Sequence, residues 1–382
     1  MISAAIVGLG RWGRTLVNAV QGKSEKLHFS HAVSRDPSRA EAFTGQHDLR
    51  TVRDLDAVLG DREIDAVVLA TPHSLHLEQI LACARAGKAV FCEKPLTMTK
   101  ADALRAVEGC RDAGVVLGVG TDKRFFPAMQ ALARLAAEGA LGRLLHIEGN
   151  FSNEVAASQF SPWRDSPEES PAGGLTGTGI HVLDSFVHIA GPVRRATAQL
   201  FSHKPAPDPL DTLSVLLEFD SGISGMLAAV RSTPAFWRVH VFGRDASAEA
   251  LGRTELVLRK PGKDPERRIF EPVDSVRVNL EAFADAVARR ALYPIPPREI
   301  VAVVAAFEAI VKSAGSNGQP IESSPRWALG YTCSCVLMGR TTPARHARKS
   351  KRVLPNMKRV LLMGTLPVGG RLSSSSRIIF NA

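Results

Sequence analysis

Three glycines near the start of the chain have the spacing of a phosphate-binding turn. An apolar run at residues 4–7 precedes them, and a helical pattern at residues 12–20 follows them. The full G-x-G-x-x-G segment consists of Gly8, Leu9, Gly10, Arg11, Trp12 and Gly13. At a strand–helix junction such glycines permit a tight turn, close backbone approach to a diphosphate and close helix packing. We therefore expect these six residues to bind a dinucleotide cofactor.

The end of the second expected strand bears on which dinucleotide binds. An acidic residue about 20 residues beyond the glycines would bind the ribose hydroxyls and favour NAD. The chain instead has Ser34 and Arg35, with Arg39 one turn further along. A hydroxyl and guanidinium groups suit a 2′-phosphate through charge-assisted hydrogen bonds. We favour NADP, with NAD as the alternative if the Asp36 carboxylate turns inward.

Lys94 and His181 are the side chains best suited to chemistry at a hydroxyl or carbonyl group. Lys94 stands at the carboxyl edge of an expected central strand, where its ammonium can stabilise alkoxide charge. The alternative is a surface salt bridge with Glu93. His181 can exchange a proton near neutral pH, and Asp184 shares its helical face and can orient it. A histidine on an apolar helix is otherwise most often structural.

Apolar runs and helical patterns alternate over residues 1–120. The expected strands are residues 4–7, 29–33, 66–70, 89–92 and 115–119, and the expected helices are 12–20, 37–43, 75–86 and 100–113. Because these strands are apolar throughout, they predict a parallel sheet covered on both faces. The fold class is α/β, with an N-terminal Rossmann dinucleotide-binding domain.

A different rhythm follows over residues 121–321. The expected strands are residues 146–153, 195–203, 212–219, 224–230, 237–242 and 255–259, and the expected helices are 128–138, 179–190, 276–290 and 297–314. Consecutive strands joined by short turns predict a largely antiparallel sheet. We expect this part to form an α+β domain that binds substrate and mediates oligomerisation.

The net charge of +10 belongs to the C-terminal residues. Residues 322–382 contain eleven Lys and Arg residues and one acid, whereas residues 1–321 contain 37 of each. A global argument for nucleic-acid binding therefore fails, and we expect no nucleic-acid partner. We expect residues 322–382 to form a basic, poorly ordered tail. An appended segment, a shifted reading frame and a basic arm for an acidic partner remain open.

Other features bear on the compartment. No apolar run approaches the roughly 20 residues that span a bilayer, and the N-terminus lacks the pattern of a secretory signal. The five cysteines are an odd number and widely spread, which is typical of reduced thiols. We expect a cytoplasmic protein without a membrane partner.

Three stretches together resemble the glucose–fructose oxidoreductase, inositol dehydrogenase and rhizopine-catabolism (Gfo/Idh/MocA) family. They are residues 8–13, residues 70–76 with Glu93-Lys94-Pro95, and residues 179–184. The resemblance covers about residues 1–320 and implies a Rossmann domain followed by an open, mostly antiparallel sheet. It implies NAD(P)-dependent hydride transfer to or from a sugar, polyol or related hydroxy or carbonyl compound. It also implies a homodimer or homotetramer and no metal, although His181, Asp184 and His188 share one helical face.

The resemblance assigns roles to individual residues. Lys94 contacts substrate beside the nicotinamide, His181 is the acid/base histidine, and Pro95 follows a cis peptide bond. Further cofactor-binding residues are expected in residues 70–76 and in Glu93-Lys94-Pro95: Thr71, Pro72, His73, His76, Glu93 and Lys94 itself. For His76 the alternative is a capping role at its helix.

One position departs from the family pattern. Many members have an aspartate four residues before the histidine, where this chain has Gly177. Three alternatives follow from the missing carboxylate. Asp184 orients His181 instead, or the proton moves through Lys94 and His181, or the chain is a non-catalytic NAD(P)-binding regulatory protein.

Substrate contacts are expected from His181 and from Arg124, Trp163 and Arg164. An indole can stack on the face of a sugar ring, and a guanidinium can pair with hydroxyls or a carboxylate. The alternative is a partly buried loop aromatic beside a surface arginine.

Overall fold

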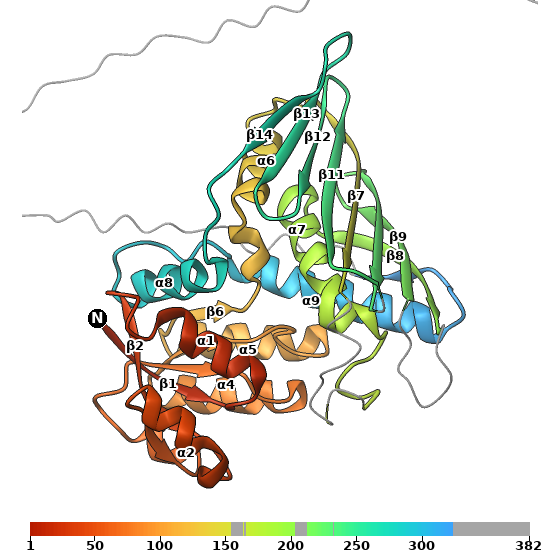
Figure 1. Cartoon of the computed structure of the whole chain (residues 1–382). Coiled ribbons are helices and arrows are strands. Elements are labelled where there is room, and N and C mark those ends of the chain that lie inside the picture. Colours follow the sequence, from red (N-terminus) through yellow and green to blue (C-terminus); the bar gives the residue numbers. More distant parts are fainter. Residues whose placement is uncertain (154–162, 164–165, 203–211, 232, 324–382) are drawn as a thin grey trace, which may run out of the picture. The chain divides into compact units, whose positions relative to one another are not determined.

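The strands of the first 120 residues form one parallel sheet. The computed structural model describes residues 1–153, 163, 166–202, 212–231 and 233–323. The strand order is β3-β2-β1-β4-β5-β6, and all neighbours run parallel. Figure 1 labels β1, β2 and β6 of this sheet. The strands are β1 Ile2–Val7, β2 Leu27–Val33, β3 Arg50–Val52, β4 Ala66–Leu69, β5 Ala89–Cys92 and β6 Leu117–Val119. This order is that of a Rossmann fold, so the predicted fold class is confirmed.

Helices cover both faces of this sheet. They are α1 Arg11–Val20, α2 Pro37–Gln46, α3 Asp56–Leu59, α4 His76–Arg85 and α5 Lys100–Asp112. Apolar residues of α1 and α2 pack on one face, and those of α3, α4 and α5 pack on the other. Strand β1 serves both cores, because Ala4 and Ile6 face one and Ala5 and Val7 face the other. The sequence missed β3, whose three residues carry no buried apolar run.

A second sheet of nine strands follows. Its order is β14-β13-β12-β11-β7-β10-β9-β8-β15, and only β7 and β10 are parallel neighbours. The strands are β7 Leu144–Ser152, β8 Val193–Phe201, β9 Thr212–Phe219, β10 Ser224–Val230, β11 Phe236–Gly243, β12 Ser247–Leu251, β13 Glu255–Arg259, β14 Glu266–Ile269 and β15 Ile321–Glu322. The predicted open, mostly antiparallel sheet is thus confirmed. Three strands were not predicted: β12, β14 and β15. All four residues of β14 are exposed and three are charged, so it has no apolar alternation.

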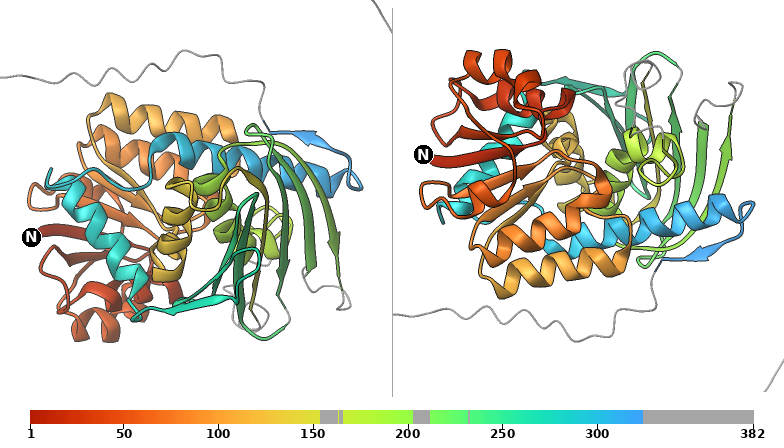
Figure 2. Two further views of the ribbon diagram at one scale, coloured as in Figure 1. Left: turned by 90° about the horizontal axis from the view of Figure 1, so that it is seen from above. Right: turned by 90° about the horizontal axis from the view of Figure 1, so that it is seen from below.

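One face of the second sheet packs against helices. The remaining helices are α6 Pro127–Ala137, α7 Ile180–Ala190, α8 Ser275–Val287 and α9 Pro297–Gly315, with a π-helical turn Leu175–Gly179 leading into α7. Apolar residues of α6, α7 and the later part of α9 share one core with the strands. On the opposite face, Leu216 and Met226 are about half exposed. Figure 2 shows the helices gathered on one side of this sheet.

The chain returns to the first sheet after building the second. Helix α8 adds Leu280, Phe283 and Ala284 to the core that contains α1 and β2. The Phe283 ring meets Phe91 edge-on, with 5.5 Å between ring centroids. Helix α9 then links both sheets, because its first turns pack with α5 and its later turns with the second sheet. The two sheets are therefore joined by packed helices as well as by the linking chain.

Two further observations concern the helices and the thiols. Over the described residues, no helix has the length and apolar character needed to cross a bilayer. Cys83, Cys92 and Cys110 are free thiols buried on the first sheet or on the helices that cover it. Burial raises the pKa of the Cys83 and Cys110 thiols to about 12, so they stay protonated at neutral pH.

The packing of α8 on the first sheet gives a stability prediction. We expect Phe283→Ala to lower the free energy of unfolding by about 3–5 kcal/mol, because the ring is fully buried. Urea denaturation followed by circular dichroism would measure it. Leu292→Ala is the control: that side chain is 94% exposed, so the change should stay within about 0.5 kcal/mol. Equal effects of the two variants would contradict the role of α8 in this core.

Candidate active site

A cleft of about 820 Å³ runs along the carboxyl edge of the first sheet toward α7. Parallel sheets bind ligands at this edge. The cleft is lined by most of the site residues that were predicted from the sequence: Gly8, Leu9, Gly10, Arg11, Trp12, Ser34, Arg35, Arg39, Thr71, Pro72, Glu93, Lys94, Trp163 and His181. The other selected residues do not line it: Gly13, His73, His76, Arg124 and Asp184. Arg164 lies outside the described residues.

The glycine turn at one end of the cleft leaves no room for side chains at two positions. Gly8 has a φ of +94°, and a Cβ there would lie 2.6 Å from the carbonyl oxygen of Ala70. A Cβ at Gly13 would overlap the carbonyl oxygen of Gly8. At Gly10, by contrast, no protein atom lies within 4 Å of the Cβ position. That open space, in front of the first turn of α1, fits a diphosphate held by backbone amides.

The next section of the cleft is rich in arginine. Arg35 and Arg39 are exposed at its wall, and Arg53 joins them from the loop after β3. Asp36 also lines this section, but its carboxylate accepts hydrogen bonds from the Ser38 hydroxyl at 2.6 Å and pairs with Arg39 at 3.1 Å. The hydrogen bond from Ser38 is the main cause that lowers the pKa of Asp36. Sequence reasoning missed Arg53 because it missed β3.

Lys94 and Glu93 lie at the opposite end of the cleft, after β5. The Lys94 ammonium donates hydrogen bonds to the backbone carbonyls of Thr176, at 3.1 Å, and Gly177, at 2.9 Å. These bonds tie the first sheet to the turn that precedes α7. The Lys94–Pro95 peptide bond is cis, as the resemblance implied. Burial raises the pKa of Glu93 to about 7, and the charge of Lys94 opposes part of that rise.

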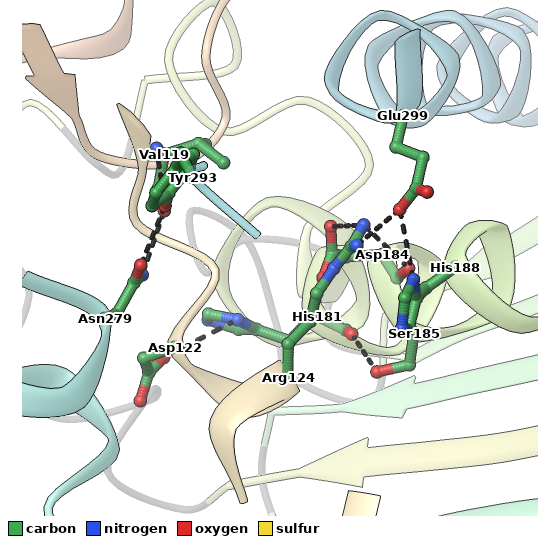
Figure 3. Close-up of polar contacts among 10 residues, drawn as sticks. All are labelled: Val119, Asp122, Arg124, His181, Asp184, Ser185, His188, Asn279, Tyr293 and Glu299. Atoms are coloured by element: carbon green, nitrogen blue, oxygen red, sulfur yellow. Dashed lines mark hydrogen bonds and ion pairs between the residues drawn. The ribbon is translucent and has the colours of Figure 1, made fainter. Parts of the chain in front are cut away.

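His181 enters the cleft from the first turn of α7. Its ring Nδ1 is buried and lies 3.9 Å from the Asp122 Oδ1 atom (Figure 3). Burial, together with the charges of Lys94 and Lys123, lowers the pKa of His181 well below its usual value. The imidazole is therefore neutral at pH 7 and able to accept a proton.

Asp184 is directed away from His181. Its two carboxylate oxygens accept hydrogen bonds from Arg124, at 2.6 and 2.8 Å, in a buried two-point pair (Figure 3). Arg124 also donates to Glu299 at 2.5 Å, and Glu299 pairs with His188 at 3.2 Å. A buried guanidinium requires such carboxylate partners, which explains the arrangement. The structure thus does not bring Asp184 to His181, and it encloses Arg124 in ion pairs instead of placing it at the cleft.

His73 and His76 support the cleft from behind. The ring nitrogens of His76 face the carbonyl oxygens of Pro95, at 2.9 Å, and Thr71, at 3.1 Å. His76 thus joins the segments that follow β4 and β5. His73 contacts the carbonyl oxygen of Glu169 at 2.6 Å, and its ring meets Trp163 edge-on. It anchors the segment that carries Trp163.

Asp122 and Lys123 were missed by sequence reasoning. They begin the short 3₁₀ turn Asp122–Phe125, which starts three residues after the end of β6. Lys123 lines the cleft and pairs with Asp122 at 2.9 Å. A usable signal was their position, because β6 ends at the same sheet edge as β5 and Lys94. Over the described residues, no three His, Cys, Asp or Glu side chains gather as a metal site would require.

These features are those of a dinucleotide-dependent oxidoreductase: a turn suited to a diphosphate, a long cleft, and an ammonium and a neutral imidazole at the far end of that cleft. Residues 2–121 match the oxidoreductase family with an NAD-binding Rossmann fold, and residues 129–249 match the GFO/IDH/MocA C-terminal domain. The chain belongs to the Gfo/Idh/MocA family, which confirms the resemblance. It is an NAD(P)-dependent oxidoreductase, as predicted.

Named relatives span different reactions. The D-xylose 1-dehydrogenase (NADP(+)) 2 of Haloferax volcanii is 29% identical, over 81% of this chain and 95% of its own. The inositol 2-dehydrogenase 2 of Saccharopolyspora erythraea is 29% identical, over 86% of this chain and 98% of its own. The 2,7-anhydro-N-acetylneuraminate hydratase of Escherichia coli is 28% identical over 63% of this chain, which spans 64% of that relative, just under two thirds.

The open space at Gly10 gives a binding prediction. We expect Gly10→Ala to fold normally and to weaken binding of NAD⁺ and NADP⁺ by roughly 10- to 100-fold, because the added methyl group occupies the diphosphate position. Titration calorimetry and melting temperature would measure both effects. Gly45→Ala is the matched control, since Gly45 also has open space but lies on α2, off the cleft. Unchanged affinity in Gly10→Ala would rule out this diphosphate site.

Proposed function

We propose that the chain is an NADP(H)-preferring dehydrogenase or reductase that interconverts a CH–OH group and a carbonyl in a sugar, polyol or related compound. The observation that carries the proposal is the neutral imidazole of His181 at the Lys94 end of the dinucleotide cleft. Beside a hydride acceptor, a base that is neutral at pH 7 can take the hydroxyl proton, and a fixed ammonium can stabilise the charge on the oxygen.

The two side chains would divide the chemistry between them. A nicotinamide cofactor bound in this cleft would supply the hydride acceptor for oxidation of the carbinol carbon and the hydride donor for reduction of the carbonyl carbon. His181 takes the hydroxyl proton during oxidation and returns it during reduction. The Lys94 ammonium stabilises the negative charge that develops on the same oxygen. Its hydrogen bonds to Thr176 and Gly177 fix the ammonium before substrate arrives.

The walls near His181 support a ring-shaped hydroxylated substrate. Trp163 and Phe151 contribute aromatic faces to the cleft, and Asn153 and Lys123 contribute polar groups. Aromatic faces stack on sugar rings, and amide and ammonium groups bind hydroxyls. Relatives named for D-xylose and inositol are consistent with this class. The proposed contact from Arg164 falls outside the described residues.

The arginine-rich section of the cleft supports NADP over NAD. Arg35, Arg39 and Arg53 line it together with the Ser34 hydroxyl, which suits the 2′-phosphate. The Asp36 carboxylate is engaged by Ser38 and Arg39 and is thus less available to ribose hydroxyls. The relative from Haloferax volcanii is named for NADP⁺.

The remaining proposals concern organisation. We propose that the chain consists of three parts, residues 1–120, 121–321 and 322–382, and that α8 and α9 link the first two. Half-exposed apolar residues on the open face of the second sheet, Leu216 and Met226, support a homodimer or homotetramer through that face. Reduced, buried thiols accord with a cytoplasmic location.

The proposed division of roles gives a kinetic prediction. We expect Lys94→Ala and His181→Ala each to lower kcat by on the order of 100-fold or more, while the Kd for NADP⁺ changes by less than about threefold. Absorbance of the reduced nicotinamide across a panel of aldoses and cyclic polyols would measure turnover, and calorimetry would measure binding. If the wild-type protein binds NADP⁺ but reduces it with no member of the panel, the non-catalytic alternative gains support.

Cofactor preference gives a separate prediction. We expect Arg35→Ala to weaken NADP⁺ binding by about 10- to 100-fold and NAD⁺ binding by less than about threefold, because a charge-assisted hydrogen bond to the 2′-phosphate is lost. Titration calorimetry with both cofactors would measure the ratio. Arg62→Ala is the control, because Arg62 is exposed and does not line the cleft. Equal losses for both cofactors would show that Arg35 does not read the phosphate.

A further inference from the structure

Two buried polar atoms face each other beside the cleft without a hydrogen bond. They are Nδ1 of His181 and Oδ1 of Asp122, 3.9 Å apart, and neither has a hydrogen-bond partner among the described residues. Buried polar atoms are normally satisfied, so such a pair requires an explanation. Catalytic hydrogen bonds are often long in ligand-free proteins and tighten when substrate binds. A shift of about 1 Å would bring these atoms within hydrogen-bond distance.

The Asp122 carboxylate is held in place on its other oxygen. Its Oδ2 atom accepts hydrogen bonds from the Ser275 hydroxyl, at 2.9 Å, and from the Lys123 ammonium, at 2.9 Å. Ser275 is the first residue of α8, so this carboxylate is fixed from two separate segments of the chain. Fixing Oδ2 leaves Oδ1 as the oxygen directed at the imidazole (Figure 3).

No other described carboxylate is so placed. Gly177, four residues before His181, has no side chain, and its Cβ position has no protein atom within 4 Å. Asp184 is bound at both oxygens by Arg124. Glu93 directly follows β5, and its Oε2 atom accepts a hydrogen bond from the backbone amide of Lys94 at 3.3 Å. The ionisable groups on this side of the cleft are thus Lys94, Lys123 and Asp122 around His181, together with Glu93, whose buried carboxyl has a pKa of about 7.

We infer that Asp122 is the positioning residue for His181: its carboxylate accepts the Nδ1 proton, so that Nε2 is the ring nitrogen that exchanges the substrate proton. The inference rests on the proposed function and supplies the carboxylate that Gly177 lacks. A carboxylate that accepts from Nδ1–H fixes the tautomer and stabilises the imidazolium formed when the proton arrives. It also offsets the two ammonium groups that disfavour that imidazolium.

The tautomer of His181 can be read without turnover. In wild-type protein labelled with ¹⁵N-histidine, with NADP⁺ and a non-reacting polyol present, we expect the Nδ1–H form, assigned by loss of the signal in His181→Ala. In Asp122→Asn we expect the Nδ1–H population to fall. A wild-type imidazole protonated on Nε2 would overturn the inference, and this measurement requires no variant at residue 122.

Kinetics supply the second readout. We expect Asp122→Asn to lower kcat on the order of 100-fold with little change in KM, and Asp122→Glu to restore part of it. The loss should not multiply with that of His181→Ala, because both variants remove one unit. Adding Gly177→Asp to Asp122→Asn should recover at least about tenfold, since that position has room for a carboxylate beside the cleft. Wild-type turnover in Asp122→Asn, or multiplying losses, would overturn the inference.

The pH profile separates positioning from folding. The lowered pKa of His181 places the acidic limb of wild-type alcohol oxidation below about pH 6.5, since the neutral base persists as pH falls. Removing the Asp122 charge makes the imidazolium less stable, so the limb in Asp122→Asn should move to still lower pH. Asp184→Asn is the matched buried control: we expect a lower melting temperature and an unmoved limb. An unmoved limb in Asp122→Asn would count against Asp122.

The two proposals fail in different ways. If no panel compound is oxidised, the proposed function fails, and the tautomer experiment still decides the role of Asp122 at the imidazole. If oxidation occurs and His181 is required but Asp122→Asn is fully active, only the positioning role fails.

Discussion

The contact between the first turn and the first helix is the constraint on which the site depends. Backbone atoms of Gly8 and Gly13 approach so closely that a side chain at either position would collide with a carbonyl oxygen. This contact brings the start of α1 to the edge of the sheet, with its amides facing the open space at Gly10. The positions of Lys94 and His181 matter only relative to this glycine turn, because a dinucleotide bound there would span a fixed distance toward them.

The chemistry at the other end of the cleft depends on a balance of charges. Burial, together with the charges of Lys94 and Lys123, lowers the pKa of His181 and keeps its imidazole neutral, while the Asp122 carboxylate lies within 4 Å of it. Burial raises the pKa of Glu93 to about 7, although the neighbouring charge of Lys94 acts in the opposite direction. In the proposed mechanism, this arrangement provides a base that is neutral at pH 7 and a cation for the substrate oxygen. Its side chains come from the segments that follow β5 and β6 and from α7, so no single segment supplies them.

Local patterns in the sequence predicted the parts of the site that are themselves local. The glycine turn, Lys94 after an apolar strand and His181 at a helix start are each defined by neighbouring residues, and all reach the cleft except the packing glycine, Gly13. The interaction partners of these side chains, by contrast, could not be predicted from neighbouring residues. Asp184 shares a helical face with His181, yet its carboxylate pairs with the buried guanidinium of Arg124, which lies 60 residues earlier in the sequence. The approach of Asp122 to His181 likewise depends on how the sheet edge meets α7. The missed strand β14 shows the same limit, since pairing with β13 defines it and hydrophobicity does not.

The return of α8 to the first sheet affects how this enzyme can be taken apart or recombined. A fragment ending at residue 120 would lack Leu280 and Phe283, and the strands beneath them would present bare apolar surface to water. The fragment would also lack both Asp122 and Ser275, the residue of α8 that donates a hydrogen bond to its carboxylate. Replacing the dinucleotide-binding domain of this chain would therefore succeed only if α8 is replaced together with residues 1–120. The exchanged part would then consist of two separate segments of the sequence.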